Sequence, residues 1–206
     1  MHEPNELANT TVTGPVFYYD VSSPYAYLAA VRIEEVLAIE PHWQPIAFGA
    51  LIRQIDKTPW SLRDETRTTG MAEVEGRARE RGLPPLRWPP GWPAESYSLL
   101  PLRALLVAAE HDLVKQLTLA FYRREFADGV ALDDVDVVLD VVAGVGLDRE
   151  LVRSGIEREE IKQGLRAATG EAVALGVTGV PTVAIDGELF WGDDRLENAA
   201  ALLERA

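Results

Sequence analysis

The residues of this chain best suited to chemistry lie in one short stretch, Asp20-Val21-Ser22-Ser23-Pro24, between an apolar, β-prone segment and a helical pattern. Proline is favoured at the first position of a helix and serine at its N-cap, so Ser23 and Pro24 are predicted to begin a helix. A hydroxyl donor at the positive end of a helix dipole could lower the pKa of a thiol and hold its thiolate. Ser23 could also be only a helix cap, and this stretch alone leaves both interpretations open.

The chain has no cysteine. Disulfides, thiol nucleophiles and cysteine metal sites within the chain are therefore excluded, and any sulfur chemistry must use a sulfur from another molecule. The three histidines, His2, His42 and His111, are scattered, and none stands at ligand spacing from another. We therefore expect no metal site.

The charge balance argues against two further classes of partner. The 206 residues include 33 acidic and 20 basic ones, which gives a formal net charge of -13. Nucleic acid or an anionic membrane surface would have to bind against a general repulsion, so we expect neither as a partner. The sequence shows neither a signal peptide nor an apolar run long enough to span a membrane. We expect a cytoplasmic protein whose residues 1–14 form a flexible tail.

Three segments would position the Ser23 stretch. Val16 to Tyr19 is predicted to be a short buried strand, and the helix that starts at Pro24 follows it. Trp43 to Gly49 is predicted to be a second strand, which Pro45 weakens or places at a sheet edge. This β-α-β order is typical of the start of a parallel sheet.

The rest of the chain is predicted to be helical first and then mixed. Residues 56–155 show helical patterns, and one polar helix is expected to open at Ser61 with Asp64 three residues on, close to a capping box. After a further amphipathic helix, the strands "TVAID" and "ELFW" are joined by the hairpin signal Asp186-Gly187, and a closing helix follows. The order is thus β-α-β, a helical insertion, then α-β-β-α.

A second motif points to the same place in the fold. The dipeptide Val180-Pro181 follows two glycines in "GVTGVPTVAID" and immediately precedes a strand. Base rates favour a trans bond at any single proline, but the whole pattern resembles the thioredoxin fold. That fold places a cis-proline before its third strand, beside the N-terminus of its first helix.

Over residues 16–204 the chain is similar to the DsbA-like branch of the thioredoxin superfamily. Within that branch it resembles 2-hydroxychromene-2-carboxylate isomerases and kappa-class glutathione transferases. The blocks that carry the likeness are "FYYDVSSPYAYL", "GVTGVPTVAIDGELFWGDDRLE" and, more weakly, "PIAFGALIRQIDKTPW". The resemblance implies an α/β, thioredoxin-like domain formed by residues 15–55 and 156–206, with a large all-helical insertion at 56–155.

The resemblance also gives Ser23 a role. Redox members of the branch read Asp-x-x-Cys-Pro-x-Cys at this turn, which places Ser23 at the first cysteine and Ala26 at the second. Thiol exchange within the chain is therefore impossible. The isomerase and kappa-class members carry serine before the proline, and this implies that Ser23 acts on the sulfur of bound glutathione or another low-molecular-weight thiol, while Pro24 holds the helix start in place.

Four further residues are implied in binding that thiol. The backbone of Val180, before Pro181, would pair with the tripeptide in strand fashion. The element after the last strand would contact its γ-glutamyl end, which maps to Asp193 and Asp194. Either aspartate could instead only cap the final helix; we favour the cap for Asp193 and the ligand contact for Asp194.

Further candidate residues could bind a ligand carboxylate or an aromatic substrate, in a region where the chain departs from the family pattern. Of an Asn-x-Pro-Pro element found in the glutathione-using members, the chain keeps only Pro59. It offers Arg63 or Arg67 as cations for a ligand carboxylate, although arginines on a polar helix are more often solvated. Tyr97 replaces a common asparagine. Four aromatic residues would suit an aromatic substrate: Tyr25, Trp60, Trp88 and Trp92. For Trp88 and Trp92, packing is the safer interpretation.

Three functional hypotheses follow. The first is an isomerase or transferase in which a bound thiol, activated at Ser23, adds to an aromatic-type electrophile. The second is a cysteine-free DsbA-like protein that binds a peptide or small molecule without redox catalysis, because a fold alone does not establish activity. The third, and weakest, is a disulfide oxidoreductase that works with a partner's cysteine. By analogy with relatives, the chain could form a homodimer.

Overall fold

The structure is a computed structural model that describes residues 14–205. The flexible tail predicted for residues 1–14 lies outside this range, apart from Gly14. In chain order the elements are β1 (Val16–Tyr19), α1 (Pro24–Ala30), α2 (Ile33–Leu37), β2 (His42–Pro45), α3 (Phe48–Gln54), the 3-10 turn η1 (Trp60–Leu62), α4 (Asp64–Glu80), α5 (Leu99–Ala109), α6 (Val114–Tyr122), the π-helical turn η2 (Arg123–Ala127), α7 (Val135–Gly144), α8 (Arg149–Gly155), α9 (Glu159–Ala174), β3 (Thr182–Ile185), β4 (Glu188–Trp191), the 3-10 turn η3 (Asp193–Arg195) and α10 (Leu196–Leu203).

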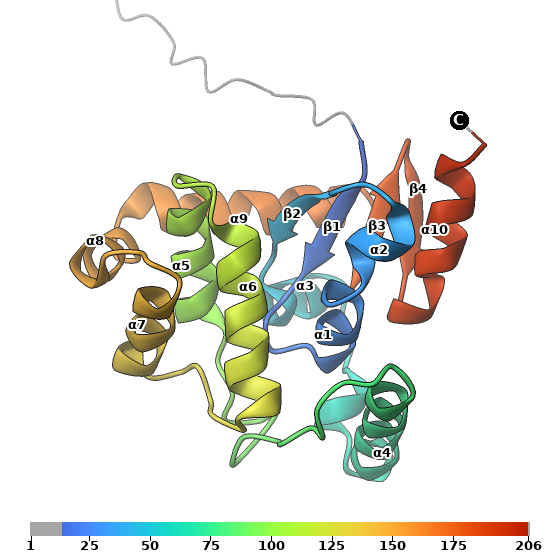
Figure 1. Cartoon of the computed structure of the whole chain (residues 1–206), viewed down its shortest axis with the longest axis horizontal. Coiled ribbons are helices and arrows are strands. Elements are labelled where there is room, and N and C mark those ends of the chain that lie inside the picture. The colour runs from blue at the N-terminus through green and yellow to red at the C-terminus, as the bar shows by residue number, and fades with distance from the viewer. Residues whose placement is uncertain (1–13, 206) are drawn as a thin grey trace, which may run out of the picture.

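The strands form one four-stranded sheet of order β2-β1-β3-β4 (Figure 1). β1 runs parallel to β2, with Val16 opposite His42, and antiparallel to β3, with Phe17 opposite Val183. β3 and β4 form an antiparallel hairpin whose turn residues, Asp186 and Gly187, both have positive φ, as a tight two-residue turn requires. The predicted thioredoxin-like α/β order is confirmed.

The second strand ends earlier than predicted. β2 stops at Pro45, and α3 begins at Phe48, inside the segment expected to be strand up to Gly49. The backbone N–H of Phe48 donates to Asp20 Oδ2 at 2.8 Å, and that of Ala47 donates to Thr169 Oγ1 at 3.0 Å. Side chains distant in the sequence thus satisfy amides that a longer strand would have paired in the sheet.

The two faces of β1 bury different sets of side chains. Phe17 and Tyr19 pack into the larger core, together with helices that include α5 and α6. Tyr18 points to the opposite face and packs with Leu51 of α3 and Ala172 of α9. This alternation follows from the two-residue repeat of a strand. Figure 1 shows α1 in front of the sheet and α3 behind it.

Between residues 56 and 155 the described elements are helices and helical turns. α5, α6, α7 and α8 pack against one another, while α4 lies apart from them and contacts α1 (Figure 1). α4 begins at Asp64 rather than at Ser61, because residues 60–62 form a 3-10 turn, and no side chain caps the helix. The boundaries of the insertion at 56 and 155 stay a prediction.

Candidate active site

The turn before α1 is organised by the buried carboxylate of Asp20. Its Oδ1 accepts hydrogen bonds from the backbone N–H and the hydroxyl of Ser22, both at 2.9 Å. Its Oδ2 accepts from the Phe48 N–H at 2.8 Å and the Ser98 hydroxyl at 3.0 Å. Burial raises the pKa of Asp20, and these hydrogen bonds oppose the rise because they favour the carboxylate. The carboxyl group therefore ties α3 and the start of α5 to the turn that carries Ser23.

Ser23 caps α1 and faces the loop before β3. Its Oγ accepts the N–H of Ala26 at 3.3 Å, which confirms the predicted cap. The same hydroxyl donates to the carbonyl oxygen of Val180 at 3.5 Å, and only 8% of Ser23 is exposed. A single hydroxyl thus satisfies the helix and points at the residue before Pro181.

The Val180-Pro181 peptide bond is cis, and its surroundings are fixed by hydrogen bonds. Thr182 Oγ1 donates to the Gly179 carbonyl at 2.8 Å, and the N–H of Gly192 donates to the Pro181 carbonyl at 2.9 Å. Val180 and Pro181 are both buried. The loop is therefore held between β3 and the end of β4, with its Val180 carbonyl facing Ser23.

The preference for Asp193 as a helix cap is wrong. α10 begins at Leu196, and no side chain caps it. Asp193 is 1% exposed, and its carboxylate forms ion pairs with Arg77, at 2.6 Å, and with Arg81. A carboxylate buried this deeply needs compensating charge, which Arg77 of α4 and Arg81, directly after that helix, provide.

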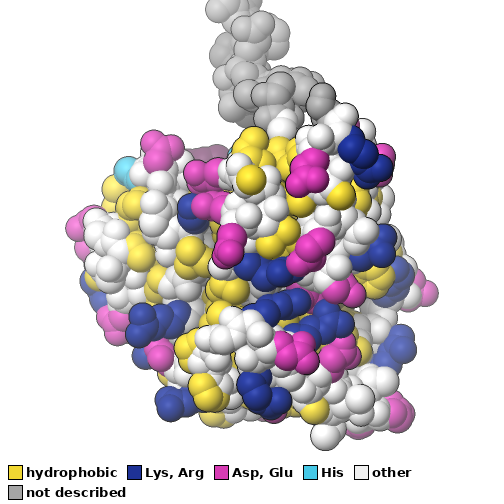
Figure 2. Space-filling view, turned by 45° about the vertical axis from the view of Figure 1, so that its right-hand side comes forward, with side chains coloured by type: hydrophobic (Ala, Val, Ile, Leu, Met, Phe, Trp, Pro, Cys, Tyr) yellow, Lys and Arg dark blue, Asp and Glu magenta, His cyan; other side chains and the backbone are white. Residues whose placement is uncertain are grey.

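Asp194 has a different environment from Asp193. Its side chain is 60% exposed, and Oδ2 lies 4.0 Å from Nη1 of Arg77. The ion pairs therefore join α4 to η3 and leave one carboxylate open to solvent beside the junction. Figure 2 shows basic and acidic side chains gathered together across the middle of one face of the molecule.

The four aromatic residues predicted for the substrate side lie together, and we call them the aromatic wall. Ring centroids are 5.8 Å apart for Tyr25 and Trp60, 5.8 Å for Trp60 and Trp92, and 4.5 Å for Trp88 and Trp92. Trp92 Nε1 also donates to the Ser22 carbonyl at 3.4 Å. The aromatic wall is thereby attached to the turn that carries Ser23.

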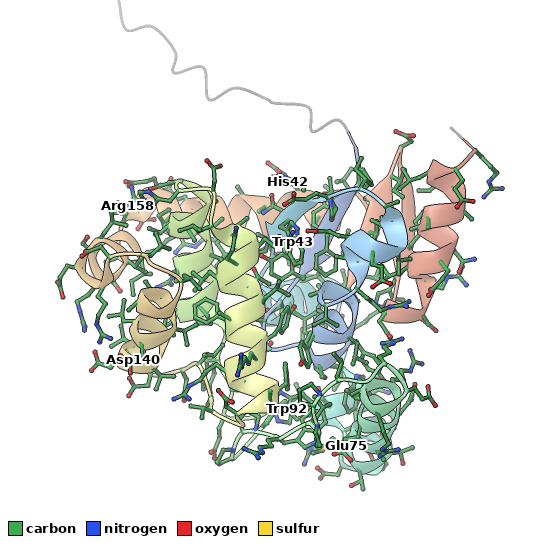
Figure 3. The ribbon with its side chains drawn as sticks, viewed as in Figure 1. His42, Trp43, Glu75, Trp92, Asp140 and Arg158 are labelled. Atoms are coloured by element: carbon green, nitrogen blue, oxygen red, sulfur yellow. The ribbon has the colours of Figure 1, made fainter. Side chains whose placement is uncertain are left out.

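α4 supports this wall through polar contacts. Trp88 Nε1 donates to Glu75 Oε1 at 2.7 Å, and the Arg77 guanidinium lies 5.4 Å from the centre of the Tyr25 ring. Figure 3 shows Trp92 and Glu75 at the same end of the molecule, below α1. Arg67, proposed as a ligand cation, instead donates to the Ser61 carbonyl at 2.7 Å and pairs with Asp64. Its partners in the structure are thus its own neighbours along the chain.

Sequence reasoning missed four residues around this site: Asp20, Arg77, Arg81 and Glu125. Asp20 begins the segment Asp20-Val21-Ser22-Ser23-Pro24, and a carboxylate at the start of a turn that leads into a helix was a signal that it could hold the turn. Arg77 and Arg81 lie on a helix whose polar pattern predicts solvent exposure on every side, so no signal distinguished them. Glu125 is 1% exposed and carried by the π-helical turn η2, which a sequence pattern does not reveal.

Residues 14–205 offer neither a candidate metal site nor a membrane-spanning helix. Within this range no group of three or more histidine, aspartate or glutamate side chains is placed to hold a metal ion. Among the same residues, no helix combines the length and the apolar character needed to cross a membrane.

A family model for the DSBA-like thioredoxin domain matches residues 16–204. The chain belongs to this family. Its sequence is 26% identical over 195 residues to the 2-hydroxychromene-2-carboxylate isomerase of Sphingobium xenophagum, covering 88% of this chain and 93% of the relative.

Solved structures share the fold. A 2-hydroxychromene-2-carboxylate isomerase has a TM-score of 0.81 at 20% identity, with 93% of this chain and 94% of that one covered. A probable DsbA oxidoreductase from Streptomyces coelicolor has a TM-score of 0.74 at 24% identity, covering 93% and 88%. The cytosolic disulfide reductase DsbM from Pseudomonas aeruginosa with GSH has a TM-score of 0.62 at 18% identity, covering 93% and 97%. The predicted resemblance to the DsbA-like family and its isomerase branch is confirmed.

Proposed function

We propose that this protein is a thiol-dependent isomerase or transferase in which the Ser23 hydroxyl holds the sulfur of glutathione or another low-molecular-weight thiol. One observation carries the proposal: in a chain without cysteine, Ser23 Oγ lies 3.5 Å from the Val180 carbonyl, next to a cis-proline. The relationship to a 2-hydroxychromene-2-carboxylate isomerase supports the same class of reaction.

The hydroxyl of Ser23 is well placed to donate to such a sulfur. Its oxygen already accepts the Ala26 N–H, so its orientation is fixed, and its proton is engaged only in a long contact to Val180. A hydrogen bond of 3.5 Å is weak, and a thiolate would be a stronger, charged acceptor. The bound thiol would supply the nucleophile that adds to an electrophilic carbon and leaves again. Pro24, the first residue of α1, fixes the start of the helix next to Ser23.

The rest of the thiol ligand would lie along the Val180-Pro181 edge. The backbone of Val180 offers strand-like pairing to a tripeptide. Asp194, which is largely exposed, would meet the ligand ammonium. Asp193 is occupied by Arg77 and Arg81, and we assign it the role of holding α4 in position rather than direct contact.

The substrate would lie against the aromatic wall. Trp92 is joined to the Ser22 carbonyl, so its ring stands beside the residue next to Ser23. The edge-on and tilted rings of the wall suit an aromatic substrate. They would also exclude water from the reacting atoms, which strengthens the electrostatic effect of a single hydroxyl.

The test is a rate measurement with glutathione and 2-hydroxychromene-2-carboxylate. We expect glutathione-dependent isomerisation by the native protein and a fall of about 100-fold in kcat/KM for Ser23→Ala, because one charge-stabilising donor is worth about that factor. Ser22→Ala is the matched control, since its hydroxyl donates to Asp20 and not toward Val180. S-methylglutathione should not support the reaction.

Two results would contradict the proposal. A Ser23→Ala protein as fast as the native one would remove Ser23 from the reaction. Absence of turnover with any thiol, together with stabilisation of the protein by peptides that lack a thiol, would favour the second hypothesis, a binding protein without catalysis.

A further inference from the structure

A groove of about 690 Å³ lies on the molecule away from Ser23. In Figure 1, α1 and α6 run side by side at the front, and the groove is bounded by these helices, the π-helical turn η2 and the proline-rich loop. Its volume is in the range of small-molecule sites. The lining residues are Tyr27, Val31, Pro84, Pro85, Arg87, Leu119, Arg123, Ala127 and Asp128.

Much of this lining is apolar. Val31, at the end of α1, and Leu119, on α6, face two adjacent prolines of the loop. Neither Ser23 nor Val180 takes part in the lining. The groove is therefore a separate site from the one proposed for the thiol.

Tyr27 presents a polar atom to this groove. The residue is 5% exposed, and its ring stacks on Phe126, with centroids 5.9 Å apart. Among residues 14–205 no hydrogen bond joins its hydroxyl to another residue, and the oxygen is not sealed from solvent, so it can reach a ligand in the groove. Burial raises the pKa of Tyr27, which keeps the phenol protonated and able to donate. A ligand acceptor in the groove would satisfy it.

Two guanidinium groups accompany this hydroxyl. Arg87 and Arg123 form no ion pair with the residues that the structure describes, and the Arg123 charge acts on Tyr27 by lowering its pKa. Asp128, the acidic residue of the lining, faces Arg124 at 3.6 Å. In a chain of net charge -13, two arginines without carboxylate partners beside an apolar groove favour an anionic ligand.

We propose that this groove binds a small apolar carboxylate, such as a bicyclic aromatic acid. The ligand carboxylate lies between Arg87 and Arg123 and accepts a hydrogen bond from the Tyr27 hydroxyl. The apolar body lies against Val31, Leu119 and the two prolines. Charge-assisted hydrogen bonds fix the carboxylate, and burial of the ring system adds affinity.

The test is calorimetric titration of the full chain with 2-naphthoate and with 2-naphthamide, its uncharged counterpart. We expect one 2-naphthoate per chain and at least about ten-fold weaker binding of the amide, because a hydrogen bond to a charged carboxylate is stronger than one to a neutral amide. Arg123→Gln and Arg87→Gln should each weaken 2-naphthoate binding about ten-fold. Tyr27→Phe keeps the ring and removes only the hydroxyl, and should weaken it less.

Matched controls separate this site from the thiol site and from general charge effects. Arg53→Gln removes an exposed arginine of α3 and should leave the affinity unchanged, as should Ser23→Ala. Equal affinity in the native, Arg87→Gln and Arg123→Gln proteins would overturn the proposal. So would an equal loss in Arg53→Gln, a loss in Ser23→Ala, or no binding at millimolar 2-naphthoate.

Discussion

Glu125 is a buried carboxyl group with few polar neighbours. It is 1% exposed, and Ser96 Oγ donates to its Oε1 at 2.8 Å. Burial raises the pKa of Glu125 to about 8, and the negative charges of Asp20 and Asp133 act in the same direction. No basic residue within the described range forms an ion pair with it. At neutral pH the group therefore carries its proton in the folded protein.

The raised pKa of Glu125 predicts that the stability of the protein depends on pH. The pKa of Glu125 is above its ordinary value of 4.5, so between about pH 4.5 and 8 the folded chain binds more protons than the unfolded chain. The contribution of Glu125 to the free energy of unfolding is then fully present below pH 4.5 and falls by about 1.4 kcal/mol per pH unit as the pH rises toward 8. Glu125→Gln should remove that slope, as measured by urea unfolding at several pH values.

A matched variant isolates the effect of burial. Glu204 is exposed near the end of the described chain, and Glu204→Gln should keep the native slope. If the difference in unfolding free energy between native protein and Glu125→Gln were the same at every pH, the raised pKa of Glu125 would be refuted.

At the scale of elements, α4 meets the aromatic wall at a glycine. A Cβ atom added at Gly70 would lie 2.2 Å from the Trp60 ring, whereas one added at Gly76, on the same helix, would meet nothing within 4 Å. Trp60 in turn packs against Tyr25 and Trp92. The position of α4 and the arrangement of the aromatic wall therefore depend on each other.

These two glycines predict opposite results. Gly76→Ala should raise the free energy of unfolding by about 1 kcal/mol, because alanine favours a helix over glycine. Gly70→Ala gains the same propensity but must displace the Trp60 ring, and should lower the free energy of unfolding by about 1–3 kcal/mol and shift the tryptophan emission. Equal stabilisation by both substitutions, with unchanged emission, would show that Trp60 is not packed on α4.

Across the whole molecule, the features predicted correctly are those that depend on residues close together in the sequence. The Ser23 cap and the hairpin at Asp186-Gly187 follow from short motifs, and the structure has both. The environment of Asp193 did not follow, because its partner Arg77 is 116 residues away in the sequence. The end of β2 was missed for a similar reason, since Asp20 takes the N–H of Phe48 across 28 residues.

The aromatic wall could be predicted only in part. Composition drew attention to Trp88 and Trp92 in a proline-rich loop, but packing was the safer interpretation for either residue. Their contact with Trp60 joins segments that only the fold brings together. The sequence could therefore suggest residues of the site, while the ion pairs that join α4 to η3 required the structure.

We propose that this chain, which has no cysteine, uses Ser23 to activate the sulfur of another molecule. The most direct measurement is the pKa of the glutathione thiol when bound, followed by the ultraviolet absorbance of its thiolate in the native protein and in Ser23→Ala. In the native protein we expect a thiol pKa at least about one unit below that of a free thiol, which is near 8.5, and in Ser23→Ala a return toward the free value. The same thiol pKa in both proteins, or no binding of glutathione to the native protein, would contradict it.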